Sequence, residues 1–201
     1  MKVLFLTRCF GEGEAGTEYV KAVSHELVEK GHEAVVVAFD DGAYYSVDDR
    51  VEVRRVGLPF EGDNMYNWSM MMNNELKKEA REAFEEKEPD IIHSIDWTAV
   101  PGGVALSRHM DIPLVVTFQS TENERGFEGE QAGVISELEW QGAFEAEKAI
   151  ATSEDTKNSL LFDLDVPEEK IDIIDPYTGN WQERVLNSYR NTIKQEKEVK
   201  N

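Results

Sequence analysis

Residues 1–39, MKVLFLTRCFGEGEAGTEYVKAVSHELVEKGHEAVVVAF, decide the fold because their hydrophobic pattern changes twice. The continuous apolar run at residues 3–6 is typical of a buried strand, and so is the run at residues 33–39. Between these runs, apolar residues recur at helical spacing: Val20, Val23, Leu27 and Val28. Gly31 stands where a helix commonly ends. A strand, a helix and a second strand in this order predict a parallel pair joined by a right-handed crossover.

The alternation of strands and helices continues along the chain. Further strands are predicted at residues 51–56, 90–95, 112–118, 148–153 and 170–174, and further helices at 65–87, 99–110, 134–147 and 153–164. The alternating pattern of residues 51–56 favours an edge strand. We therefore predict an α/β fold, a single Rossmann-like domain at residues 1–175 whose parallel sheet is flanked by helices. Because ligands of such sheets bind at the carboxyl ends of strands, the loops after Leu6, Ile95 and Phe118 are candidate sites.

The hydrophobic pattern changes abruptly where the domain ends, within residues 170–190, KIDIIDPYTGNWQERVLNSYR. A short strand is followed almost at once by an amphipathic helix. Its apolar residues fall at helical spacing: Trp181, Val185, Leu186, Tyr189 and Ile193. We expect residues 176–201 to form a C-terminal helix that packs back on the domain, since an uncovered strip would promote association.

The composition restricts the partners and the compartment. The chain carries 41 acidic against 21 basic residues, a net charge of −20, which argues against nucleic acid and anionic membranes as partners. This dispersed acid excess fits a solvated surface adapted to high salt. The single Cys9 excludes an intrachain disulfide and suits a reducing compartment. Residues 1–10 are too short an apolar run for a signal peptide, and no run reaches membrane-spanning length, so we expect a cytoplasmic protein.

Glycines follow the first strand with the spacing G-x-G-x-x-G, at Gly11, Gly13 and Gly16. Acidic residues lie among and after them: Glu12, Glu14 and Glu18. Negative charge at this position disfavours a pyrophosphate. We therefore interpret Gly16 and Glu18 as part of a site for a neutral, hydroxyl-rich ligand. The alternative is a plain turn whose acids stabilise the first turn of the helix.

Polar residues also follow two central strands. Asp96 and Trp97 together are typical of sugar binding, since a carboxylate accepts hydroxyl hydrogen bonds and a ring packs on C–H faces. Alternatively, Asp96 caps the next helix and Trp97 belongs to the core. After the strand at 112–118 we expect four side chains to project into the same crevice: Gln119, Ser120, Thr121 and Glu122. The long loop up to Gly133 is equally consistent with a mobile segment.

The remaining polar residues do not indicate a catalytic, metal or cofactor site. With one Cys and scattered His, no metal site is predicted, and no catalytic triad can be assembled. No cofactor is indicated. Trp68 and the three methionines at 70–72 are interpreted as core residues that pack on the sheet.

The motifs and their order resemble the N-terminal domain of glycogen and starch synthase-like retaining glycosyltransferases, which have the GT-B architecture of two Rossmann-like domains. The resemblance rests on five stretches: MKVLFLTRCF…AGTEYVKAVSHELVEKGHEAVVV, PDIIHSIDW, IPLVVTFQSTENERG, ISELEWQGAFEAEKAIATSEDTKNSLL and VPEEKIDII. In that family the last strand leads into a second domain that binds the nucleotide-sugar, and a final helix crosses back. The resemblance implies that NWQERVLNSYRNTI is this crossover helix and that the donor-binding domain is lacking here.

Three positions depart from the family pattern. The family's K-x-G-G is matched by residues 13–16, GEAG, and its H-D-W by Ile95-Asp96-Trp97. Its T-x-H, whose His lines the catalytic crevice, is Thr117-Phe118-Gln119. Gln119 still donates and accepts hydrogen bonds but cannot titrate.

The resemblance implies an acceptor-side half of a glucan synthase-like hexosyltransferase that is inactive alone, so that activity as an enzyme is left open and no residue is assigned a catalytic role. Such a half would bind a glucan or sugar acceptor, or pair with a separate donor-binding chain. The alternative is a non-catalytic regulatory protein that binds a full-length synthase or itself as a homodimer.

Overall fold

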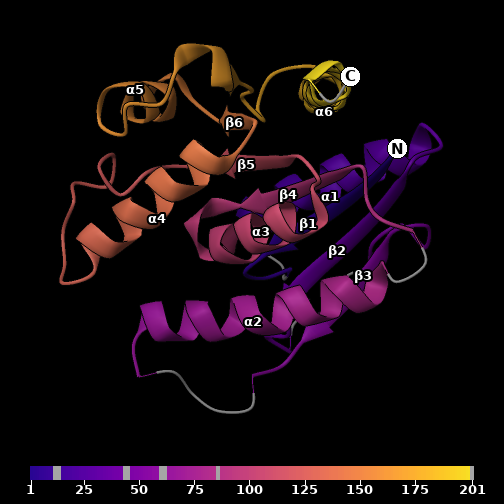
Figure 1. The fold of residues 1–201 in the computed structure, drawn as a ribbon, viewed down its shortest axis with the longest axis horizontal. Helices are drawn as coiled ribbons and strands as arrows, with labels where there is room; N and C mark the ends of the chain where they lie inside the picture. The colour runs from indigo at the N-terminus through magenta and orange to yellow at the C-terminus, as the bar shows by residue number, and fades with distance from the viewer. Residues whose placement is uncertain (11–14, 43–45, 59–62, 85–86, 200–201) are drawn as a thin grey trace.

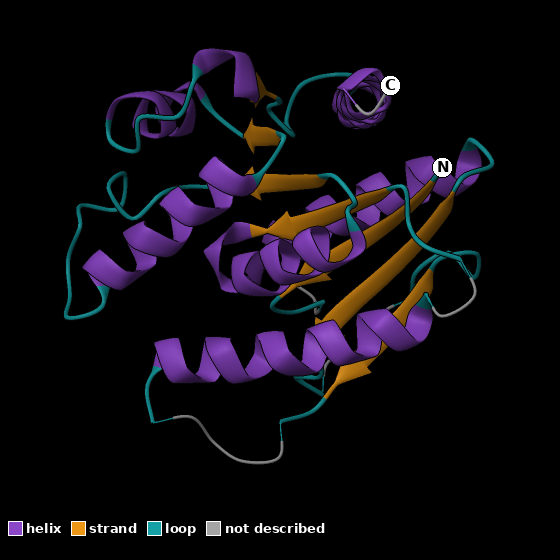
Figure 2. Ribbon diagram, in the orientation of Figure 1, coloured by secondary structure: helices purple, strands orange, loops and turns teal. Residues whose placement is uncertain are grey.

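The computed structural model describes residues 1–201 except 11–14, 43–45, 59–62, 85–86 and 200–201. In the described residues, seven parallel strands form one sheet in the order β3-β2-β1-β4-β5-β6-β7 (Figures 1 and 2). The strands are β1 (Lys2–Thr7), β2 (Glu33–Phe39), β3 (Glu52–Val56), β4 (Ile91–Ile95), β5 (Leu114–Phe118), β6 (Lys148–Ala151) and β7 (Ile171–Ile173). The predicted α/β Rossmann-like fold is confirmed, and β3 is an edge strand as its alternating pattern predicted.

Six α-helices accompany the strands in the described residues: α1 (Ala15–Glu29), α2 (Met65–Ala83), α3 (Asp96–Met110), α4 (Ala132–Glu145), α5 (Glu154–Phe162) and α6 (Trp181–Val199). Each corresponds to a helix predicted from the sequence. Helices α4 and α5 differ from their predicted bounds by one or two residues at each end, and larger differences occur at one end of α2 and of α3. Helix α2 ends at Ala83 rather than residue 87, because Phe84 leaves helical geometry and is buried. Helix α3 begins at Asp96 rather than residue 99, directly after β4.

The helices are divided unequally between the two faces of the sheet. Helices α2, α3, α4 and α5 cover one face, where their apolar residues meet Leu4, Ile92 and Val116. The other face, with Val3, Ile91 and Ile150, is covered by α1 and α6 (Figure 1). Right-handed crossovers explain this division, because α1 joins strands that progress one way along the sheet while α2 to α5 join strands that progress the other way.

The apolar strip of α6 is buried against this second face. Trp181 is 8% exposed, and Val185, Leu186 and Tyr189 are fully buried. Ile193 packs against the same core and is partly exposed. Helix α6 therefore shares one hydrophobic core with α1 and the sheet. The division at residue 175 into a domain and a separate helix stays a prediction.

A buried polar chain links α6 to the sheet. The Tyr189 hydroxyl lies 2.6 Å from His93 Nδ1, and His93 Nε2 lies 2.8 Å from Thr117 Oγ1. Thr117 Oγ1 donates to the Tyr19 hydroxyl at 3.1 Å. Since the one hydroxyl proton of Thr117 goes to Tyr19, His93 donates from Nε2 and accepts from Tyr189 at Nδ1. Burial lowers the pKa of His93 to about 3, so its imidazole is neutral in the folded protein.

Asn73 joins α2 to α3 by inserting its side-chain amide into the hydrogen-bond ladder of α3. Its Nδ2 donates to the Thr98 carbonyl at 2.7 Å, and its Oδ1 accepts from the Gly102 N–H at 2.8 Å. The amide thereby bridges the two groups that an uninterrupted helix would join to each other. A Cβ at Gly102 would lie 2.6 Å from Asn73 Oδ1, so glycine allows this close approach. The two helices are therefore fixed relative to each other.

Trp68 and the methionines after it contribute unequally to the core. Met72 is fully buried, and Trp68 packs edge-on against Phe39 at a centroid distance of 5.2 Å. Met70 and Met71 are partly exposed. Within the described residues, no helix combines the length and the apolar content that crossing a membrane requires.

Candidate functional site

Three of the predicted site residues, Gly16, Asp96 and Gln119, lie close together at the carboxyl ends of β1, β4 and β5. Strands β1 and β4 are neighbours, but the chain leaves them toward opposite edges of the sheet. Ligands of open α/β sheets commonly bind at such a point, at the carboxyl ends of the strands. Gly16, in the first turn of α1, lies here: a Cβ on it would be 3.5 Å from Ile95 Cγ2 and 3.7 Å from Gln119 Nε2. Asp96 begins α3 beside the same point. We refer to Gly16, Asp96 and Gln119 as the crevice.

Asp96 connects the ends of two strands. Its Oδ1 accepts a hydrogen bond from the Gln119 N–H at 2.9 Å. Its backbone has a φ of 56°, a left-handed conformation that Asp adopts more readily than most residues and that recurs at functional sites. Asp96 does not cap α3, since the residue before that helix is Ile95 and no side-chain cap hydrogen bond is made there. The capping interpretation is therefore wrong.

The environment of Asp96 disfavours its charge. Burial raises the pKa of Asp96 to about 6, while the Gln119 N–H and the positive charges of Arg125 and Arg8 act in the opposite direction. The side chain is still partly exposed at the crevice. Within the described residues Oδ2 makes no hydrogen bond, so this oxygen can accept one from a ligand.

Trp97 and Glu18 do not join this group. Trp97 is 8% exposed, as the core interpretation predicted, and presents little surface to a sugar. Glu18 is exposed and lines a cavity of about 530 Å³ with Lys21, His25 and Asp48. Two residues along a helix correspond to more than half a turn, so Glu18 cannot face the same way as Gly16. Of the first glycines, Gly11 and Gly13 lie outside the described residues.

The stretch after β5 divides into an accessible and a buried half. Gln119 and Ser120 are partly exposed. Thr121 is fully buried, with its Oγ1 2.6 Å from Ser159 Oγ, and Glu122 is 6% exposed. The expectation that all four side chains project into one crevice is therefore wrong for Thr121 and Glu122, because both are turned inward and hold the loop.

Glu139 anchors this loop, and the sequence analysis did not identify it. It is fully buried on α4, and its two carboxylate oxygens accept from the Glu122 N–H at 3.0 and 2.8 Å. Arg125 donates to Glu139 Oε1 at 3.0 Å, to Glu122 Oε2 at 2.8 Å and to Ser120 Oγ at 2.7 Å. Burial raises the pKa of Glu139 to about 7, against the favourable effect of Arg125. The sequence did offer one signal of this burial: Glu139 lies four residues before Ala143, so helical spacing places the acid on the same face of α4 as an apolar residue.

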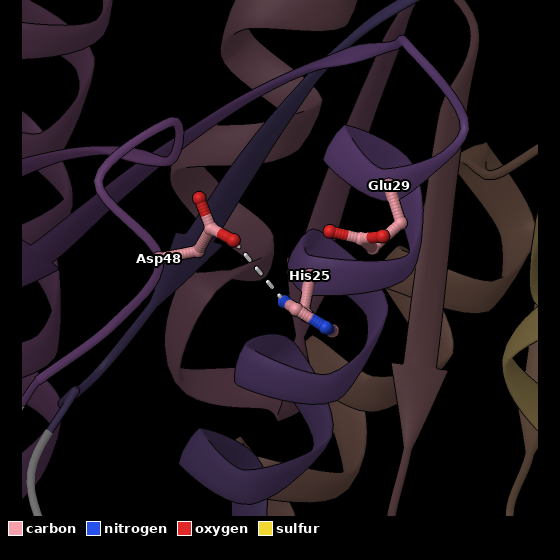
Figure 3. Close-up of side chains that lie close together, drawn as sticks. All are labelled: His25, Glu29 and Asp48. Carbon is pink, nitrogen blue, oxygen red and sulfur yellow. Dashed lines mark ion pairs between the residues drawn. The ribbon is translucent and has the colours of Figure 1, made fainter.

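A second group of polar residues lies away from the crevice. Figure 3 shows His25, Glu29 and Asp48 close together, with His25 Nδ1 3.5 Å from Asp48 Oδ2. Their ligand atoms are close enough for a metal ion, but Arg50 already pairs with both carboxylates: with Glu29 and, at 2.7 Å, with Asp48. Hydrogen bonds from Arg50 hold the pKa of Asp48 well below its usual range. The guanidinium supplies the positive charge that a metal would otherwise provide.

Comparison with known proteins relates this arrangement to a family. The sequence model of Glycosyltransferase Family 4 matches residues 16–176. A curated relative, the uncharacterized glycosyltransferase MJ1607 of Methanocaldococcus jannaschii, is 26% identical over 189 residues, which covers 87% of this chain and 47% of the relative. The chain thus spans about half the length of the relative that it matches.

The solved structures agree in fold. A chain of sucrose-phosphate synthase from Thermosynechococcus elongatus has a TM-score of 0.69 at 12% identity, and the match covers 96% of this chain and 99% of that chain. HepE of Anabaena, in complex with UDP and glucose, has a TM-score of 0.61 at 20% identity, over 87% of this chain and 44% of HepE. Since the family match covers most of its length, the chain belongs to Glycosyltransferase Family 4 and corresponds to the N-terminal-like half of GT-B glycosyltransferases.

Proposed function

We propose that this chain is the acceptor-side domain of a sugar-transferring enzyme and that its crevice binds a hydroxyl-rich sugar, with a glucan as the first candidate. The observation that carries the proposal is the position of Asp96, whose carboxyl group is held at the point where the loops after β1 and β4 diverge. A carboxylate accepts hydrogen bonds from hydroxyl groups and needs no phosphate or metal to do so.

Each crevice residue has a distinct role in this proposal. The Gln119 N–H holds Asp96 Oδ1, which orients Oδ2 toward the ligand. The Gln119 side chain both donates and accepts, and it matches the mixed character of a sugar hydroxyl. Gly16 leaves space between Ile95 and Gln119 that any larger residue would reduce. Two positioned acceptors and one open backbone position suit the orientation of an acceptor hydroxyl for transfer.

The donor site belongs, in this proposal, to a second Rossmann-like domain outside these 201 residues. Transfer from a nucleotide-sugar requires positive charge at the leaving diphosphate. The chain spans about half of its relatives, and the similar fold of HepE was solved with UDP and glucose, which supports a nucleotide-sugar as donor. The second domain can belong to a separate chain or to the same polypeptide.

Calorimetry tests the acceptor role directly. We expect maltooligosaccharides to bind in high salt, and ADP-glucose and UDP-glucose to show no binding to this chain alone. Asp96→Asn and Gln119→Ala should weaken the binding, while Glu137→Gln, an exposed position on α4, serves as the control. A folded chain that binds no sugar would contradict the proposal and would favour the regulatory alternative.

A further inference from the structure

Three basic side chains differ from all other basic side chains that the structure describes. Every other described Lys or Arg makes an ion pair, a hydrogen bond or another electrostatic or ring contact. Within the same residues, Lys77, Lys78 and Arg81 have no such side-chain partner. In a chain of net charge −20, acids are abundant and most cations find one. Three unpaired cations therefore require an explanation.

All three line one groove between α2 and α3, which lie side by side on one face of the sheet (Figure 1). The groove has a volume of about 590 Å³. Helix α2 contributes Lys77, Lys78 and Arg81, and α3 contributes His109 from the opposite wall. Glu82 is the one acid among the described residues that line it. The groove is consequently a local concentration of positive charge on an acidic molecule.

The groove is preformed. Asn73 hydrogen-bonds both to the Thr98 carbonyl and to the Gly102 N–H, and it lies one turn before Lys77 on the same helix. This connection fixes α2 against α3 and so fixes the distance between the two walls. The protein backbone around the groove therefore does not need to become ordered when a ligand binds, which lowers the free-energy cost of binding.

We propose that this groove binds a compact polyanion, a small molecule that carries phosphate groups. Arg81 offers a planar fork of donors that fits phosphate oxygens, and Lys77 and Lys78 offer mobile point charges beside it. His109 adds a donor from the other wall. The groove is large enough for a phosphorylated sugar or nucleotide and is not shaped around a single ion.

The charge distribution favours a small ligand over an anionic macromolecule. At physiological salt, charges farther apart than about 8 Å are largely screened, so a compact anion responds mainly to the groove. A nucleic acid or an anionic membrane extends beyond the groove and meets the acidic surface that surrounds it. The net charge of −20 therefore opposes extended partners more than compact ones.

This site is independent of the sugar crevice. The crevice lies at the carboxyl ends of β1, β4 and β5, while the groove is formed by the outer surfaces of α2 and α3. The inference therefore goes beyond the proposed function, and either can fail without the other.

Nitrogen-15 NMR with inorganic pyrophosphate as the probe tests the proposal, in the lowest salt that keeps the chain folded. We expect saturable shifts of backbone amides at residues 77–81 and 105–109, with little change at Asp96 and Gln119. The triple variant Lys77→Gln, Lys78→Gln, Arg81→Gln should bind at least tenfold more weakly. The matched control Lys157→Gln, Arg190→Gln, Lys194→Gln removes three paired cations elsewhere and should bind like the parent.

Three results would overturn the proposal. The first is the absence of saturable shifts at α2 and α3 up to millimolar pyrophosphate. The second is equal weakening by the two triple variants, which would indicate a general charge effect. The third is a parent chain that does not bind pyrophosphate but sediments with phosphatidylglycerol vesicles, while the groove variant does not sediment. This result would make the groove a membrane contact. Amide spectra that are unchanged away from the substituted residues verify that each variant is folded.

Discussion

Replacing Asp96 by Asn should make the folded chain more stable at neutral pH while weakening its affinity for sugar. Burial raises the pKa of Asp96 from the ordinary 3.8 to about 6. Each pKa unit corresponds to about 1.4 kcal/mol, so ionised Asp96 costs the folded state about 3 kcal/mol above pH 6. The Asn amide resembles the neutral carboxyl group: it has no charge, and its oxygen still accepts from the Gln119 N–H. We expect a gain of about 2–3 kcal/mol at pH 7.5, since some solvent reaches the side chain.

The sign of the effect gives it a characteristic pH dependence. An acid whose pKa is raised on folding destabilises the protein when it ionises, so its cost is full above pH 6 and disappears as the pH falls toward 4. At pH 4 the variant and the parent should differ by about 0.5 kcal/mol. Urea unfolding in high salt at both pH values measures the two differences. Glu137→Gln, an exposed acid on α4, should change the free energy of unfolding by less than about 0.5 kcal/mol at either pH.

Sugar affinity provides the second half of the prediction. A hydrogen bond to a charged acceptor contributes about 1 kcal/mol more than one to a neutral acceptor, so sugar binding should weaken about fivefold. Stability gained together with affinity lost would identify Asp96 as a residue kept for binding at the expense of the fold. An Asp96→Asn variant that is no more stable than the parent at pH 7.5, or equally more stable at pH 4 and 7.5, would refute this account of the buried charge.

Three further perturbations address the core and the loop. His93→Gln should make the folded chain less sensitive to acid, because the folded imidazole is neutral with a pKa of about 3 whereas the unfolded one binds a proton. Between pH 7.5 and 4.5 the free energy of unfolding, measured in urea, should fall by about 2.5 kcal/mol more for the parent than for the variant, and equal losses would contradict this. Gly103→Ala should cost about 1–3 kcal/mol in thermal unfolding, because its Cβ would overlap Ser94 Oγ, and a second change, Ser94→Ala, should recover part of the loss. Glu139→Ala should speed hydrogen exchange of the Glu122 amide about tenfold or more while amides of the central strands keep their rates, since an amide that loses its buried acceptor opens more easily.

The order of strands and helices could be predicted because each element carries its own pattern. Residues 33–39 form β2 with the predicted boundaries, since the run of three valines at its centre lies between Gly31 and Asp40. The helix predicted from residue 153 forms as α5, because Ser153 caps it and accepts from the Thr156 N–H at 3.0 Å. The end of α2 was predicted wrongly because its polar pattern continues past Ala83, while the burial of Phe84 is a tertiary effect that the local sequence does not contain.

The candidate site could be predicted only in part, for a related reason. Gly16, Asp96 and Gln119 follow from geometry, because the carboxyl ends of neighbouring parallel strands lie at one edge of the sheet. The inward turn of Glu122 depends on Glu139, which lies 17 residues away on another helix. The insertion of Asn73 into α3 depends in the same way on a helix encountered later in the chain. Polar residues with distant partners look like surface residues when only the sequence is read.

The handedness of the fold explains why α6 is needed. Right-handed crossovers place α3, α4 and α5 on one face of the sheet, so the connections between β4, β5, β6 and β7 leave the opposite face uncovered. Ile91, Val115 and Ile150 on that face are fully buried, in the core cluster that α6 shares with α1. Full burial of a large apolar side chain contributes about 1.5–3 kcal/mol, so several such residues exceed the net stability of a marginal domain. Whatever chain a relative carries between β7 and this helix, the same topology requires that something return to cover this face.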